Sequence, residues 1–189
     1  MVLAVTGTIG SGKSTVCGIL ENMGYPVVSA DEVGHKILFY EDVKEKIVSE
    51  FGDVLDGKGN IDRKKLSDTV FRSEERVRKL NDITHPVIRE EIKKEIADLS
   101  EKHSDVVCEI PLLFECGFED LADKILLVYV SEETALKRLL KRGMTEEDAK
   151  KRLKNQMDYT KKTEKSDFFI SNEENLEKLA FKVAKVFNK

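Results

Sequence analysis

The chain has 189 residues, of which 40% are hydrophobic and 36% are charged. This hydrophobic fraction is large enough for a folded core and excludes a globally disordered protein. Lys and Arg total 32 and Asp and Glu total 36, so the net charge of −4 argues against nucleic acid or a membrane surface as a partner. The length suits one domain, or one core with small appended subdomains.

The cysteines and the apolar runs exclude two further classes of protein. The longest apolar runs fall far short of the roughly 18 residues that a membrane span requires, and the first residues lack the basic leader of a signal peptide. Cys17, Cys108 and Cys116 are odd in number and show no Cys-x-x-Cys spacing. We therefore expect buried free thiols and a cytoplasmic protein rather than a disulfide scaffold or a zinc finger.

Short continuous apolar runs alternate with helical patterns along the chain. The runs predict strands at 2–6, 26–30, 105–110, 124–130 and 167–170, and helices at 14–23, 41–51, 63–71, 73–102, 132–143, 145–165 and about 173–188. Runs without alternation are typical of strands that helices cover on both faces. The pattern predicts an α/β protein with a five-stranded parallel sheet, and the long helical stretch between the second and third strands predicts an inserted helical subdomain.

The segment Gly7-Thr8-Ile9-Gly10-Ser11-Gly12-Lys13-Ser14 matches the phosphate-binding pattern G-x-x-x-x-G-K-[ST] at every fixed position. An apolar strand precedes it and a helix pattern follows it, as this motif requires. We therefore expect a three-layer P-loop NTPase core. The backbone N–H groups of the loop would surround phosphate, Lys13 would reach the β- and γ-phosphates, and Ser14 would bind Mg²⁺.

Motifs of the other P-loop classes are missing. The chain has no Asn-Lys-x-Asp segment of a GTPase and no Leu-Ser-Gly-Gly-Gln segment of an ABC-type ATPase. No strand ends in a clean apolar run followed by Asp; the third strand ends in Glu109-Ile110-Pro111, and we take Asp31, after the second strand, as the best strand-terminal carboxylate. Because parallel strands end at one edge of the sheet, Asp31 is a candidate to orient an acceptor hydroxyl and take its proton; capping the next helix is the simpler alternative.

Residues 137–165 carry a local excess of positive charge, with eleven Lys and Arg against five Asp and Glu. Arg138 and Arg142 are spaced i, i+4 on one helical face, and Arg152 follows. Beside a P-loop, such a segment favours a closing lid whose arginines neutralise the charge of phosphoryl transfer, although a charge run by itself is usually a solvated face.

An ordered set of segments resembles the dephospho-coenzyme A kinase family over nearly the whole chain. Besides the loop, the resemblance rests on Ser29-Ala30-Asp31, Gly59–Arg63, Leu80–Ile88 with His85-Pro86, Pro111-Leu112-Leu113-Phe114-Glu115, and the order of Arg138, Arg142, Arg152, Gln156 and Asn172. The resemblance implies transfer of the γ-phosphate of ATP to the ribose 3′-hydroxyl of dephospho-coenzyme A, the last step of coenzyme A biosynthesis, with Mg²⁺. It also implies a nucleotide-binding core at 1–31, 104–131 and 166–189, a helical acceptor-binding domain at 32–103 and a lid at 132–165.

Site residues carry over by position. Gly10, Ser11, Gly12, Lys13, Ser14 and Thr15 would bind ATP, and Asn172 would lie near its adenine, although capping of the last helix suits Asn172 equally. Asp31 would be the general base, and Arg138 and Arg142 would act from the lid. Asp31, Arg63, His85 and Glu115 would form the acceptor side.

Four positions depart from the family pattern and keep alternatives open. Thr8 stands for a Gly in the loop, Ser29 for an Asp, His35 for an Arg and Ala135 for a Gln. Thr8 implies a different backbone angle at that position. Ser29 and His35 motivate the alternative of another small-molecule or nucleoside monophosphate kinase. A P-loop nucleotide switch without acceptor chemistry is a further alternative. The sequence leaves the oligomeric state open.

Overall fold

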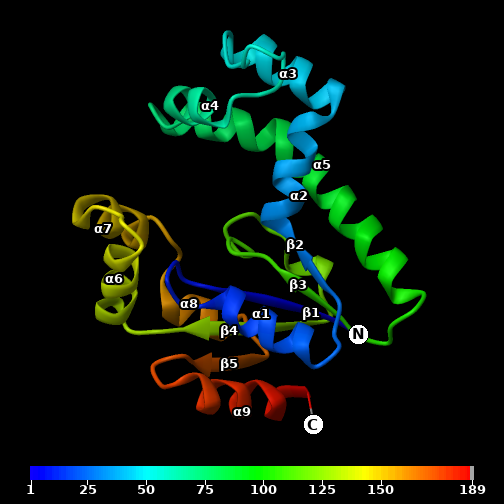
Figure 1. Ribbon diagram of the computed structural model, residues 1–189, viewed down its shortest axis with the longest axis vertical. Coiled ribbons are helices and arrows are strands. Elements are labelled where there is room, and N and C mark those ends of the chain that lie inside the picture. The colour runs from blue at the N-terminus through cyan, green and yellow to red at the C-terminus, as the bar shows by residue number, and fades with distance from the viewer. Residues whose placement is uncertain (188–189) are drawn as a thin grey trace. The chain divides into compact units, whose positions relative to one another are not determined.

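The computed structural model describes residues 1–187, and Figure 1 shows the order of their helices and strands. The chain forms two compact units. One contains residues 1–29 together with the chain from residue 95 onward, and the other contains residues 30–94.

The first unit is built on a five-stranded sheet whose strands all run parallel, in the order β2-β3-β1-β4-β5. The strands are β1 (Val2–Gly7), β2 (Val27–Ser29), β3 (Val106–Glu109), β4 (Lys124–Tyr129) and β5 (Phe168–Ser171). β1 is central, pairing with β3 on one side and β4 on the other. The predicted parallel α/β sheet is therefore confirmed, with each strand placed within a residue or two of its predicted bounds.

The helices α1 (Lys13–Asn22) and α9 (Leu176–Phe187) pack on this sheet and form an apolar core with it. α1 contacts β1 and β3, and α9 contacts β5 and α1. Val16, Cys17 and Leu20 of α1 are buried among apolar side chains of the strands and of α9. Since burial of a Val or Leu side chain contributes about 1.5–3 kcal/mol, this cluster fixes α1, and the loop before it, against the strand ends.

The second unit is helical. It contains α2 (Ala30–Lys36), the short 3₁₀ helix η1 (Ile37–Phe39), α3 (Glu41–Phe51), α4 (Arg63–Val70) and the larger part of α5 (Glu74–Ser100). Strand β2 ends at Ser29, so Ala30 and Asp31 belong to α2, where the sequence analysis extended the strand to residue 30.

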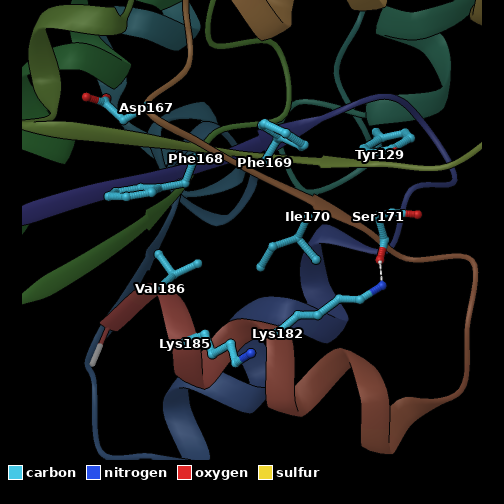
Figure 2. Close-up of a pocket in the computed structure, with 9 residues that line it drawn as sticks. All are labelled: Tyr129, Asp167, Phe168, Phe169, Ile170, Ser171, Lys182, Lys185 and Val186. Atoms are coloured by element: carbon cyan, nitrogen blue, oxygen red, sulfur yellow. Dashed lines mark hydrogen bonds between the residues drawn. The ribbon is translucent and has the colours of Figure 1, made fainter. Parts of the chain in front are cut away.

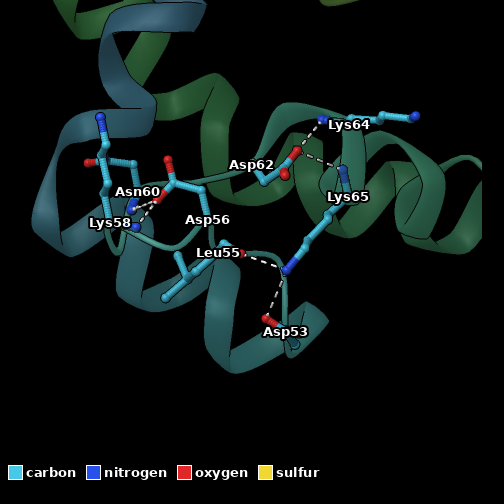
Figure 3. Close-up of polar contacts among 8 residues, drawn as sticks. All are labelled: Asp53, Leu55, Asp56, Lys58, Asn60, Asp62, Lys64 and Lys65. Carbon is cyan, nitrogen blue, oxygen red and sulfur yellow. Dashed lines mark hydrogen bonds and ion pairs between the residues drawn. The ribbon is translucent and has the colours of Figure 1, made fainter.

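The loop between α3 and α4 is ordered by two aspartates (Figure 3). Asp56 Oδ1 accepts from the backbone N–H groups of Lys58 and Asn60, and Leu55 pairs with Ile61 in a single antiparallel bridge. Asp62 then caps α4 by accepting from Lys64 N and Lys65 N. Such side-chain caps contribute about 1 kcal/mol each, which explains a defined loop in so polar a segment.

The segment predicted as one helix over 145–165 is two helices. α6 (Glu132–Lys141) is followed by α7 (Glu146–Lys154) and α8 (Tyr159–Glu164). Thr145 caps α7 by accepting from Asp148 N, and α7 ends at Lys154. Asp158 then starts a new helix by accepting from Thr160 N. The basic segment is thus a set of three short helices with a link at 155–158.

The last helix also begins later than predicted, at Leu176 instead of about 173. Asn175 Oδ1 accepts from Lys178 N at this helix start, so Asn175, not Asn172, performs the capping role. The predicted end at 188 lies outside the described residues. Within residues 1–187 no helix is long and apolar enough to cross a membrane. All three thiols are free, with Cys17 and Cys108 buried and Cys116 partly buried.

Candidate active site at the phosphate-binding loop

The loop Gly7–Ser14 joins the end of β1 to the start of α1, as the motif predicted. Gly12 has a φ of 90°, and a Cβ there would lie 2.3 Å from Asn172 Nδ2. Gly10 has a φ of 80° and lies against the backbone of Ala135. Both positions therefore require glycine. Thr8 does not have a positive φ, so the backbone at this position is one that a threonine adopts readily.

Lys13, the first residue of α1, folds back over the loop. Its side chain is buried, and Nζ donates to Gly7 O at 3.0 Å and to Thr8 O at 3.1 Å. Ser14 and Thr15, in the same helical turn, are exposed. The loop therefore presents a lysine ammonium, two hydroxyls and the positive end of a ten-residue helix at one place, which suits the phosphates of a nucleotide.

A carboxylate that the sequence analysis passed over lies beside this loop. Ser14 Oγ donates to Glu109 Oε1 at 2.9 Å. Glu109 ends β3 and lies in register with Val5 of β1 and Ser29 of β2. The sequence shows Glu109 as an acidic residue at the end of a strand. The strand does not, however, match the expected pattern of an apolar run followed by Asp, because Ile110 and Pro111 come after Glu109. A hydroxyl and a carboxylate oxygen so close together are hard ligands of the kind that Mg²⁺ takes together with phosphate oxygens.

Arg138 and Asn172 hold the outer side of the loop. Arg138 donates to Gly10 O at 3.2 Å, Ser11 O at 3.3 Å and Asn172 O at 2.7 Å. The buried Asn172 donates from Nδ2 to Ser11 O at 2.8 Å. Both side chains line a hollow of about 220 Å³ next to the loop, together with Gly12, Thr15, Arg142, Leu176 and Leu179. The lining of this hollow thus combines polar groups with two leucines.

The remaining arginines of the basic segment are exposed. Arg142 ends α6 and contributes to the same hollow, whereas Arg152 lies on α7. The structure therefore brings Arg138 and Arg142 together with Gly12, Thr15 and Asn172, and it gives Arg138 three bonds that the sequence did not foresee.

Glu115 lies against α8. Its Oε1 atom is 2.8 Å from Lys162 Nζ and accepts from Met157 N at 3.0 Å. Burial by itself would raise the pKa of Glu115, but Lys162 and the Met157 N–H outweigh it and hold this pKa below its ordinary value. Glu115 is therefore a carboxylate fixed by a buried lysine, and the sequence had not foreseen that contact.

Asp31, Arg63 and His85 belong to the helical unit. Asp31 is exposed in the first turn of α2, two residues after the end of β2, and Arg63 is exposed at the start of α4. His85 lies in α5, half-buried; burial lowers its pKa, and the nearby Asp82 opposes this only in part.

None of the three thiols is suited to nucleophilic chemistry. Burial raises the pKa of Cys108 to about 12 and that of Cys116 to about 11, and it raises the pKa of Cys17 further still. All three remain protonated near neutral pH, in agreement with their predicted role as small apolar side chains.

A larger hollow, of about 490 Å³, lies away from the loop, over β5 and α9 (Figure 2). Tyr129, Phe168 and Phe169 line it with the stems of Lys182 and Lys185, and Lys182 Nζ donates to Ser171 O at 3.0 Å. None of the predicted site residues is among its lining residues, so the smaller hollow at the loop is the candidate active site.

Comparisons with known proteins show which family the chain resembles along its length. A family model described as dephospho-CoA kinase matches residues 1–178. The dephospho-CoA kinase of Aquifex aeolicus is 41% identical over 189 residues, covering 98% of this chain and 95% of the relative. Among solved structures, a Thermus thermophilus protein is 32% identical with a TM-score of 0.87, over 100% of this chain and 96% of that one. The dephospho-CoA kinase of Campylobacter jejuni is 35% identical with a TM-score of 0.76, over 99% and 95%.

The loop, the carboxylate beside it and the adjoining hollow therefore stand in a chain that is similar along its length to kinases of one activity. The match of the family model over most of the chain, and the identity over its full length, show that this chain belongs to the dephospho-CoA kinase family, the ATP-dependent phosphotransferases of coenzyme A biosynthesis.

Proposed function

We propose that the chain transfers the γ-phosphate of ATP to the ribose 3′-hydroxyl of dephospho-coenzyme A at the Gly7–Ser14 loop. The backbone N–H groups of Gly10 to Thr15 receive the β- and γ-phosphates, and the ammonium of Lys13 neutralises their charge. Support comes from the buried Lys13, which already lies over the carbonyl groups of the loop.

The base of ATP occupies the hollow of about 220 Å³ next to the loop. Leu176 and Leu179 offer an apolar wall for the purine. Asn172, predicted to lie near the adenine, anchors this wall to the loop through Ser11 O.

Ser14 and Glu109 are the groups that would hold Mg²⁺. Their oxygen atoms lie 2.9 Å apart beside the phosphate-binding loop, so the residues fit a cation that also takes phosphate oxygens and water as ligands. When bound there, Mg²⁺ would neutralise negative charge on the phosphate oxygens.

Asp31 orients the acceptor hydroxyl and takes its proton. It follows β2 by two residues, and β2 ends in register with Glu109, so chain connectivity supports this role. Arg63, His85 and Glu115 serve the acceptor side, and the helical domain at 32–103 binds the acceptor. As the bond from the γ-phosphorus to the ADP oxygen breaks, the bond to the 3′-oxygen forms and the proton passes to Asp31.

The segment 132–165 is the lid, and Arg142 with Arg138 stabilises the negative charge that spreads over the transferred group. Closure excludes water, so ATP is not lost to hydrolysis. No nucleic acid or membrane takes part, and we expect the reaction to take place in the cytoplasm.

One observation carries the proposal: the phosphate-binding loop with the Ser14–Glu109 contact beside it, in a chain of this family. The test is incubation of the purified protein with Mg-ATP and dephospho-coenzyme A, followed by mass spectrometry of the acceptor. One added phosphate that disappears in Lys13→Ala supports the proposal. Turnover of ATP without this product, and phosphorylation of a nucleoside monophosphate instead, would contradict it.

A further inference from the structure

A side chain from the link between α7 and α8 reaches the phosphate-binding loop. Gln156 Oε1 accepts a hydrogen bond from the backbone N–H of Ile9 at 2.8 Å, and Gln156 is partly buried. The amide thus fixes a peptide group in the first half of the loop. None of the proposed roles in binding or catalysis involves Gln156.

The next residue attaches the same link to a second place in the core. Met157 N donates to Glu115 Oε1 at 3.0 Å, and Lys162 Nζ lies 2.8 Å from that same oxygen. Lys162 is completely buried and the Glu115 side chain is 20% exposed. Because a buried lysine cannot exchange its carboxylate for water, this contact holds the link firmly, unlike a surface ion pair.

The rings of Tyr129 and Tyr159 add a packing contact between β4 and α8, with their centroids 4.6 Å apart. Gln156 is therefore preceded by α7, a short and mostly exposed helix, and followed by a segment that is anchored by charge and by packing. The anchored segment after Gln156 therefore determines where Gln156 lies relative to Ile9.

Each part of the loop has its own support. Lys13 holds the carbonyl groups of Gly7 and Thr8, and Arg138 and Asn172 hold those of Gly10 and Ser11. Gln156 supports the loop at Ile9, where it binds a backbone N–H group instead of a carbonyl group. A loop that is held in one shape before the nucleotide arrives binds phosphate without an ordering cost.

We propose that Gln156 is a positioning residue for the phosphates of ATP, and that Glu115, through Met157 and Lys162, holds Gln156 in place. This inference rests on the proposed binding of ATP at the loop. It adds to that proposal a residue, Gln156, that acts through the backbone of Ile9, and it gives Glu115 a structural role.

The first experiment compares Gln156→Met, which keeps length but removes the acceptor oxygen, with Lys154→Met, a matched change at an exposed position two residues earlier. Titration calorimetry gives the Kd for ATP, and steady-state kinetics give kcat and both KM values. We expect Gln156→Met to raise the Kd and KM for ATP about three- to tenfold, the range of one hydrogen bond. The KM for dephospho-coenzyme A, the kcat and the Tm should stay close to wild type, as should every value of Lys154→Met.

An unchanged or tighter Kd for ATP in Gln156→Met overturns the proposal, since a residue that blocked the loop would give the tighter value. A rise of both KM values together with a lower Tm also overturns it, because that pattern belongs to a general loss of structure. Failure of the wild-type protein to bind ATP would instead contradict the proposed function, so the two failures are distinguishable.

A second experiment tests the link to Glu115. If Glu115 acts through Gln156, Glu115→Gln should raise the Kd for ATP, and the double variant Glu115→Gln Gln156→Met should be no worse than the weaker-binding single variant. Independent, multiplicative losses overturn this part of the inference. Where Glu115→Gln leaves Lys162 buried without its carboxylate and the protein fails to fold, Glu115→Gln Lys162→Met removes both charges and takes its place in the cycle.

Discussion

Ser14 and Glu109 are separated by 95 positions in the chain, yet the Ser14 hydroxyl donates to Glu109 Oε1 at 2.9 Å. The contact exists because β3 lies next to β1, whose end leads into the loop. It places a carboxylate beside the hydroxyl that the motif assigns to Mg²⁺. Glu109 is thereby the residue that completes the proposed cation site.

Glu109→Gln keeps an acceptor for Ser14 but removes the charge. We expect the Mg²⁺ concentration for half-maximal activity to rise about tenfold or more, since Mg²⁺ prefers anionic oxygen ligands. Activity measured against Mg²⁺ at fixed ATP checks this, with Glu101→Gln, at an exposed position, as the control. An unchanged Mg²⁺ requirement would remove Glu109 from the cation site.

The sequence predicted the loop because its chemistry is encoded within eight consecutive residues. It predicted the parallel sheet because buried strands leave continuous apolar runs. Glu109 was missed because its role depends on which strands are neighbours, and local spacing does not carry that information. The Gln156–Ile9 contact spans 147 positions and has the same cause.

Element ends were harder to predict than elements. The helical pattern continues from α7 into α8, whereas the helix breaks after Lys154 and Asp158 caps a new helix by accepting from Thr160 N. Asn172 and Asn175 are both plausible caps on sequence, and only the packing of Asn172 against Ser11 O separates them.

Arg138 and Arg142 should differ in kinetic signature. Arg138→Ala removes bonds to Gly10 O, Ser11 O and Asn172 O, so it should mainly raise the Kd for ATP, by about tenfold. Arg142→Ala should lower kcat more than it weakens ATP binding, because its proposed partner is the charge of the transition state.

Binding by calorimetry and single-turnover rates separate the two effects, and Lys141→Ala, at an exposed position on α6, controls for loss of charge in the segment. Equal losses of binding and turnover in Arg142→Ala would argue against its transition-state role.

The two asparagines near the end of the sheet form a matched pair. Asn172→Ala removes a buried bond to Ser11 O and should weaken ATP binding about three- to tenfold. Asn175→Ala removes a helix cap and should lower the free energy of unfolding by about 1 kcal/mol without affecting ATP. Urea unfolding and ATP titration of both variants test whether one change affects ATP binding and the other affects stability. A loss of ATP affinity in Asn175→Ala alone would contradict the roles given to the two asparagines.

His85 predicts a pH dependence of stability. Burial lowers its pKa in the folded protein below the ordinary value of 6.5. As pH falls, His85 therefore takes up a proton in the unfolded chain before it does so in the folded protein. The free energy of unfolding is thus at its full value above pH 6.5 and decreases below it, by at most about 1.4 kcal/mol per pH unit for one proton. Urea unfolding at pH 7.5 and 5.5 should show a smaller loss in His85→Gln than in wild type. The exposed His103→Gln should behave as wild type, and an equal loss in all three proteins would contradict the prediction.

Asp31 carries the proposed proton transfer, and its neighbour Glu32 supplies the control, since both are exposed in the first turn of α2. Asp31→Asn keeps the size of the side chain but cannot take a proton. We expect kcat to fall by about 10²- to 10⁴-fold, the range for loss of a general base, while the Kd for ATP stays within about twofold because no phosphate contact is lost. Glu32→Gln should retain nearly full turnover. The measurement is kcat at saturating ATP and dephospho-coenzyme A for all three proteins, together with the Kd for ATP. Full activity in Asp31→Asn would show that the acceptor hydroxyl loses its proton without this carboxylate, and the residue would then be left with a role in orienting the acceptor alone.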